Sequence, residues 1–168
     1  MEPHRIQDAF QYRSRHDIAA ATKNDPMPMP PHPPDPGTPV FWVTWDDDAQ
    51  YLINDSGETL PSVVVDTGGF ETTESGMLTK QGGDLRYENV QPGEAVKIDF
   101  FDCMEDGVVQ VLAQVDSPTW GAFQLGLVRM GSEMSGERVV LWDTGEVGRR
   151  VQIRWDSEGA EPCAIGDM

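Results

Sequence analysis

The chain from residue 40 onward has no histidine. The three histidines of the sequence, His4, His16 and His32, all precede that point. Imidazole is the usual general base beside a serine or cysteine nucleophile, and it is a common zinc ligand. We therefore expect no Ser-His-Asp, Cys-His or histidine–zinc chemistry in residues 40–168, and we predict that the protein is not an enzyme.

Cysteine, long apolar runs and nucleotide-binding motifs are also scarce or missing. Cys103 and Cys163 lie far apart and fit no C-x-x-C spacing, which favours free thiols in a reducing compartment and leaves a single disulfide open. No apolar run approaches the roughly 18 residues of a membrane-spanning helix, and residues 1–17 hold no apolar core of a secretion signal. No P-loop or G-x-G-x-x-G occurs. We predict a cytoplasmic protein without a cofactor and without membrane association.

Positive charge is scarce as well. The chain has 29 acids against 12 bases, a formal net charge of −17. Residues 1–39 hold five of these acids and four of the bases, so residues 40–168 hold 24 and eight, a net of −16. Such a field repels nucleic acid and anionic membranes and attracts basic proteins. We expect no direct nucleic-acid binding and a basic protein partner, and the oligomeric state stays open.

Residues 1–39 differ in composition from the rest. A few apolar residues before residue 22 allow a short helix. Eight of the 13 prolines then lie between Pro26 and Pro39, a density that excludes helix and sheet and favours an extended linker. We predict a flexible, disordered, Pro-rich N-terminal tail over residues 1–39 and one domain over residues 40–168.

The clearest strand pattern lies in residues 87–118. Val96 and Ile98 alternate with polar neighbours, as in a strand with one buried face. A second alternating run over residues 109–115 follows Asp106-Gly107. Two such runs around an Asp-Gly turn predict a β-hairpin whose apolar face packs on a second sheet.

Short strands recur along the rest of the chain. About nine or ten of them follow residue 40, separated by Gly, Pro, Asn and Asp turns and without a convincing helix. This spacing is typical of antiparallel sandwiches and barrels. We predict an all-β fold, an antiparallel β-sandwich that is immunoglobulin-like or related. The Cys…Trp…Cys spacing of antibody domains is missing from the sequence.

The acids offer two candidate roles. Two acidic turns, residues 46–48 and residues 102–106, each place several oxygen atoms close together, as calcium requires. Neither has the EF-hand spacing, and we predict no metal. We expect a partner-binding surface instead, made of Asp46, Asp47, Asp48, Asp55, Glu58, Asp99, Asp102, Glu105 and Asp106.

The five tryptophans fall into two groups. Trp45 and Trp155 lie on the apolar phase of their strands and are expected in the core. Trp42, Trp120 and Trp142 lie on the other phase or in a loop. They form a candidate ligand platform on which a sugar ring could stack, or they fill a second buried face.

These observations predict a non-catalytic interaction module. A rigid acidic β-sandwich would cover a basic surface of another protein, as small acidic immunity proteins and inhibitors do. One alternative is a structural or adaptor module that is tethered through its Pro-rich N-terminal arm. Another is a carbohydrate-binding module that uses exposed tryptophans.

Overall fold

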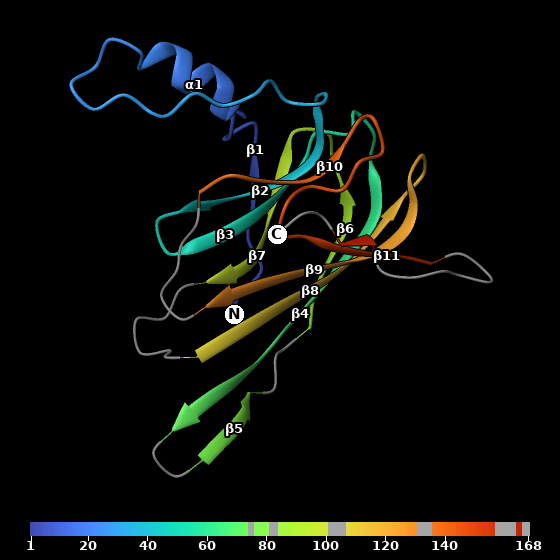
Figure 1. Cartoon of the computed structure of the whole chain (residues 1–168). Coiled ribbons are helices and arrows are strands. Elements are labelled where there is room, and N and C mark those ends of the chain that lie inside the picture. Colours follow the sequence, from blue (N-terminus) through green and yellow to red (C-terminus); the bar gives the residue numbers. More distant parts are fainter. Residues whose placement is uncertain (74–75, 81–83, 101–106, 131–135, 157–163, 166–168) are drawn as a thin grey trace.

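The computed structural model describes residues 1–73, 76–80, 84–100, 107–130, 136–156 and 164–165 (Figure 1). The described chain is mostly β-strand, arranged in two antiparallel sheets. The two sheets face each other around one set of apolar side chains, as in a sandwich. The predicted all-β class with antiparallel sheets is therefore confirmed.

Sheet A has five strands in the order β1-β7-β3-β2-β10. Their bounds are Arg5–Gln7 for β1, Glu94–Phe100 for β7, Ala49–Asn54 for β3, Pro39–Asp46 for β2 and Arg138–Trp142 for β10. β2 and β3 form a hairpin. β1 comes from the N-terminal segment and pairs with the edge of β7 that faces away from β3.

Sheet B has seven strands, with β12-β11-β9-β8-β4-β5 in order and β6 paired to β4. Their bounds are Ala164–Ile165 for β12, Gln152–Trp155 for β11, Gly121–Met130 for β9, Gly107–Ser117 for β8, Leu60–Thr73 for β4, Gly76–Lys80 for β5 and Asp84–Val90 for β6. β4 is longer than the sequence indicates. It continues through Gly68-Gly69 because both glycines pair with β8.

Alternating side chains of both sheets build the inner core. Val96 and Ile98 of sheet A are fully buried, and Val111 and Leu125 of sheet B are 1% and 0% exposed in the same cluster. Each such side chain contributes about 1.5–3 kcal/mol when it leaves water. The inward phase that the sequence predicts for Val96, Ile98 and Val111 is confirmed.

The predicted hairpin between β7 and β8 is wrong. β7 pairs with β3 and β1 in sheet A, whereas β8 pairs with β4 and β9 in sheet B. The two strands bury their apolar faces against each other from opposite sheets. Alternation reveals which side of a strand is buried, but it carries no information about the neighbouring strand.

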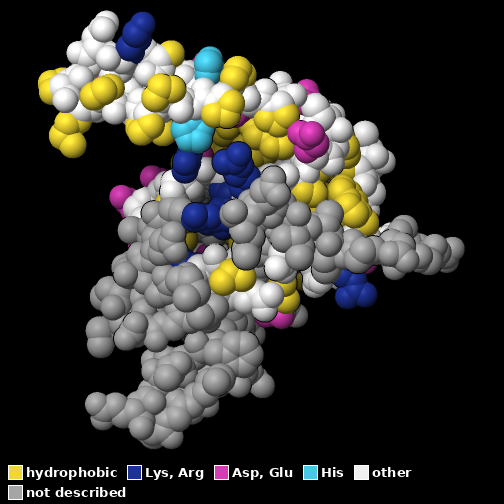
Figure 2. Space-filling model, viewed as in Figure 1, with side chains coloured by type: hydrophobic (Ala, Val, Ile, Leu, Met, Phe, Trp, Pro, Cys, Tyr) yellow, Lys and Arg dark blue, Asp and Glu magenta, His cyan; other side chains and the backbone are white. Residues whose placement is uncertain are grey.

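The N-terminal segment has two parts. The predicted short helix is present as α1, Arg15–Ala21, and Ser14 Oγ caps it by accepting from Asp17 N–H at 2.9 Å. α1 and the Pro-rich stretch project from the sheets, and Figure 2 shows hydrophobic side chains over much of that projection. Residues 4–12 lie on sheet A instead, whereas the sequence predicts a flexible tail over all of residues 1–39. Within the described chain, no helix has the length and apolar character that crossing a bilayer requires.

Candidate interaction surface

The outer face of sheet A is apolar. Three of its strands read as continuous apolar runs instead of alternating ones, a pattern typical of strands buried on both sides. The outward side chains of these three strands and of β7 form a second cluster, separate from the inner core. Its buried members are Trp42, Ala49, Tyr51, Ile53, Ala95, Val139 and Trp142.

Residues 4–12, which we call the N-terminal arm, cover this face. Ile6, Phe10 and Tyr12 pack against the cluster and are themselves half-buried. The ring centroids of Phe10 and Tyr51 are 5.5 Å apart, and Tyr12 lies edge-on to Trp42 at 5.6 Å. Such aromatic pairs contribute about 0.5–1.5 kcal/mol beyond the area they bury.

Backbone hydrogen bonds fix the register of the arm. β1 pairs with β7, and beyond this ladder Lys97 N–H donates to His4 O at 3.0 Å. Asp8 N–H donates to the carbonyl of Gly93 at 3.1 Å. Gly93 follows Pro92 in the turn before β7, and its φ of +78° is the value that a type II turn requires at its third residue. A Cβ atom there would also meet the Asp8 carboxylate, which would have to move, so the missing side chain at Gly93 lets the arm lie close to the turn.

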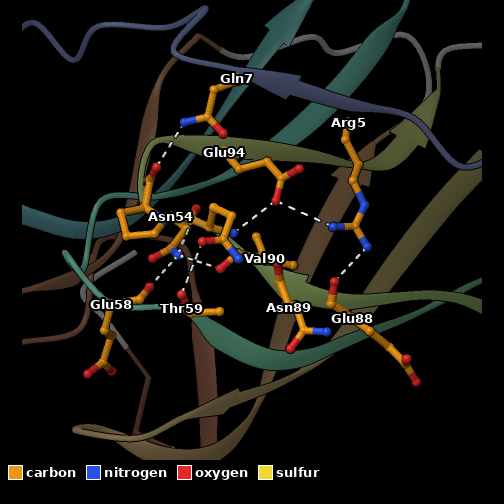
Figure 3. A network of polar contacts seen from close by, with 11 residues as sticks. Arg5, Gln7, Asn54, Glu58, Thr59, Glu88, Asn89, Val90 and Glu94 are labelled. Carbon is orange, nitrogen blue, oxygen red and sulfur yellow. Dashed lines mark hydrogen bonds and ion pairs between the residues drawn. The ribbon is translucent and has the colours of Figure 1, made fainter.

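Arg5 is held at the outer edge of the sheet (Figure 3). Its guanidinium lies 3.4 Å from a carboxylate oxygen of Glu94 and donates to the carbonyl of Glu88 at 2.8 Å. It also lies 5.5 Å from the centroid of the Tyr87 ring, within the range of a cation–π contact. The body therefore binds a cationic side chain through a carboxylate, a carbonyl and an aromatic ring.

All three tyrosines of the chain touch the arm or belong to it. Burial raises the pKa of Tyr12, and a hydrogen bond of 3.0 Å from its hydroxyl to Asp35 raises it further. Burial likewise raises the pKa of Tyr51, with a smaller contribution from the charges of Asp46 and Asp48. Burial also raises the pKa of Tyr87.

Three predicted partner-binding acids, Asp46, Asp47 and Asp48, are exposed together at the turn between β2 and β3. We call these three residues the acidic turn. The turn is close enough to Tyr51 to influence its pKa, and the hydroxyl of Tyr51 is 2.8 Å from His4 Nδ1. The acidic turn thus borders the end of the arm-covered face where the arm begins.

Two other predicted acids lie at the opposite end of sheet A. Asp55 N–H donates to the carbonyl of Val40, and Val40 is six residues from Asp46 along β2. That separation is about 20 Å at roughly 3.3 Å per residue. Asp55 accepts from Trp42 Nε1 at 2.6 Å.

Glu58 has a structural role at the same end. Its carboxylate accepts from Ser117 Oγ at 2.7 Å, from Thr119 N–H at 3.0 Å and from Thr119 Oγ1 at 2.6 Å. Burial raises its pKa, but these three bonds outweigh burial and lower the pKa overall. Glu58 therefore joins the β3–β4 connection to the start of the β8–β9 turn.

Asp99 is buried, which corrects the prediction that it faces a partner. The β3–β7 register shifts by one residue, so that Tyr51 pairs with Lys97 but Gln50 pairs with Asp99. A β-bulge of this kind reverses the alternation. Asp99 is 3% exposed and lies 3.1 Å from Arg129 Nε of β9, which forms an ion pair between the sheets.

The predicted nine-residue surface is thus not one surface among the residues that can be placed. Asp102, Glu105 and Asp106 lie outside the described residues, as do Cys103 and Cys163. In the described part of the chain, no group of three or more His, Cys, Asp or Glu side chains is placed to hold a metal ion.

The exposed tryptophan platform is not what the structure shows. Trp42 is fully buried, Trp142 is 9% exposed, and both contact Tyr12 of the arm. Trp120 is half-buried and packs against the inner core. Trp42 and Trp142 instead fill the second buried face that the sequence left open.

Comparison of the chain with models of known protein families, with curated proteins and with solved structures finds no match. The fold and the surface define the protein only as a class. It is an all-β protein with two facing antiparallel sheets, one of which has an aromatic outer face covered by the chain's own N-terminal arm.

Proposed function

We propose that the protein is a non-catalytic acidic interaction module that binds a basic partner protein, in the manner of an immunity protein or inhibitor. The Arg5 site supports this proposal most directly. There the body already holds a cationic side chain of a docked segment with Glu94, the carbonyl of Glu88 and the ring of Tyr87. The net charge of −16 over residues 40–168 would attract such a partner over a distance.

Among the predicted acids that the structure describes, the three of the acidic turn lie together and exposed, and we expect the partner to bind there. By contrast, Asp99 forms a buried ion pair and Glu58 is engaged with Ser117 and Thr119. Partner binding would therefore begin at the acidic turn and continue onto sheet A.

Charge reversal at the acidic turn tests the proposal on a partner captured from the source organism. Asp46→Lys/Asp48→Lys should slow association at least about fivefold at 50 mM salt, because steering depends on these charges. The difference should shrink towards 500 mM as the Debye length falls from roughly 14 to 4 Å. Asp47 is left unchanged because its φ is +51°.

The matched control is Asp66→Lys/Asp116→Lys, two exposed acids on the outer side of sheet B. It makes the same change in net charge and should slow association less than about twofold. Equal slowing by both variants, or binding that ignores salt, would contradict the proposal.

We also infer an immunoglobulin-like strand arrangement. The pairing order β2-β3-β7 in sheet A and β4-β8-β9 in sheet B matches the A-B-E and C-F-G strands of that fold. The adaptor alternative, with a tether formed by the Pro-rich N-terminal segment, stays a prediction. The cytoplasmic location and the domain boundary at residue 40 stay predictions.

A further inference from the structure

We propose that the outer face of sheet A is a peptide-binding face that the arm occupies in place of the partner. The partner's own segment would displace the arm and bind in the same way. This inference rests on the proposed function, because the occupant belongs to the basic partner. Its chemistry is given by the arm: an extended strand with an arginine, followed by two aromatic side chains two residues apart.

Each feature of that segment has a counterpart, either on the outer face of sheet A or at its β7 edge, next to β6. The strand adds to β7, as in other complexes formed by strand addition to a sheet edge. The arginine meets the Glu94 carboxylate and the Tyr87 ring. The two aromatic side chains take the places of Phe10 on Tyr51 and of Tyr12 between Trp42 and Trp142.

The arm is attached in a way that permits displacement. Its strand is only three residues long, and Phe10 and Tyr12 stay partly exposed. The described inner core contains no residue from the arm, so the two sheets keep their common packing when the arm leaves. Residues 13–38 then give the arm a tether of 26 residues, long enough for it to detach.

The apolar character of the face favours replacement of the arm by another segment over a state in which the face is uncovered. Without a cover, seven apolar side chains, two tryptophans among them, would be exposed together. Soluble monomers rarely expose contiguous apolar patches of that kind unless a partner covers them. A segment that offers similar aromatic side chains would therefore replace the arm in one step of exchange.

A fluorescent synthetic peptide of residues 3–14 serves as the probe, and its binding to the full chain is followed by anisotropy. A tethered arm competes at an effective concentration of about millimolar, so releasing it should raise the affinity for the peptide at least about tenfold. Phe10→Ala/Tyr12→Ala is the released variant. Met27→Ala is the matched control, because Met27 lies on the same N-terminal segment but is 91% exposed.

The expected result is tight binding to Phe10→Ala/Tyr12→Ala and weak binding to Met27→Ala. A peptide that carries alanine at both aromatic positions should bind neither. Equal binding to both proteins, or no binding to a released variant that still melts cooperatively, would overturn the inference. If Phe10→Ala/Tyr12→Ala does not fold, Ile6→Asp releases the arm from the β7 side instead. Because no partner protein is used, the result is independent of the charge-reversal test of the proposed function.

Discussion

The outer faces of the two sheets differ in what covers them. On sheet A, Trp42, Tyr51 and Ile53 lie under the arm and are at most 5% exposed. On sheet B many of the outward side chains that the structure describes are polar and exposed. The exposed residues there include Gln110, Gln114, Asp116, Val128, Gln152 and Arg154. One sheet therefore needs a third layer and the other does not.

This difference is visible in the sequence once the structure is known. β8 alternates apolar and polar residues along most of its length, as expected for a strand with one wet face. Phe41-Trp42-Val43 and Tyr51-Leu52-Ile53 are continuous apolar runs instead. A continuous run in a two-sheet protein thus indicates a covered outer face, and in this structure the arm is the cover.

Truncating one outward side chain on each sheet should give the largest difference in the free energy of unfolding between the two faces. Trp42→Ala removes a fully buried ring and should cost about 3–5 kcal/mol of the free energy of unfolding in urea. Gln114→Ala, at an exposed outward position of sheet B, should change it by less than about 0.5 kcal/mol. Similar losses in both variants would contradict the difference between the faces.

The ion pair of Asp99 and Arg129 joins the two sheets in the interior, and breaking it should lower the stability of the whole protein. Arg129→Met leaves the Asp99 carboxylate buried without its guanidinium, and breaking such a pair costs about 3–5 kcal/mol. Arg129→Met/Asp99→Leu should recover most of that loss, because no buried charge remains. Urea unfolding of both variants checks this, and a double variant that is no more stable than the single one would be the contrary result.

Removing the cover should weaken one face without unfolding the protein. A chain of residues 38–168 retains every described member of the inner core. We expect its midpoint of thermal unfolding to fall by less than about 10 °C, with the tryptophan fluorescence shifted to the red as Trp42 and Trp142 meet water. Loss of the cooperative melt would instead make the arm part of the core.

Gly57 and Gly93 have the same φ of +78°, so replacing each by alanine shows how much the arm contributes to stability. Gly57→Ala meets no atom within 4 Å and should cost only the backbone strain of about 1–2 kcal/mol. Gly93→Ala carries the same strain and also pushes Asp8 away. Its extra loss in urea unfolding should appear only when residues 1–12 are present, and in the full-length variant the β1 amides should exchange faster than in the unchanged protein.

The sequence predicts individual strands better than their partners. Val96, Ile98, Val111 and Leu125 point inward as expected, because alternation is a local property of each strand. The β7–β8 hairpin fails because pairing depends on contacts far apart in the sequence.

The candidate site was harder to predict for related reasons. The bulge that buries Asp99 cannot be recognised from the pattern of apolar and polar residues in the sequence of its strand. The docking of Ile6, Phe10 and Tyr12 depends on aromatic side chains that follow residue 40. The number of acids indicated the chemistry of a partner, but it gave no information on which acids are already engaged with serine, threonine or arginine.

The central claim is that the arm lies on sheet A and covers its aromatic face. Ultraviolet titration of the tyrosines tests it, because docking raises the pKa of Tyr12 and of Tyr51. A raised pKa means that docking is fully favoured below pH 10 and is lost as the pH rises above that value. Ile6→Asp/Phe10→Ala releases the arm and keeps all three tyrosines.

The account predicts that in the intact chain Tyr12 and Tyr51 ionise above their ordinary pKa of 10, and that in Ile6→Asp/Phe10→Ala both shift down towards 10. Tyr87 belongs to the inner core, where burial raises its pKa, and release of the arm removes the His4 and Arg5 contacts that lower it, so the pKa of Tyr87 should stay raised instead of falling. Superimposable titration curves for the two proteins would show that the arm does not cover the face.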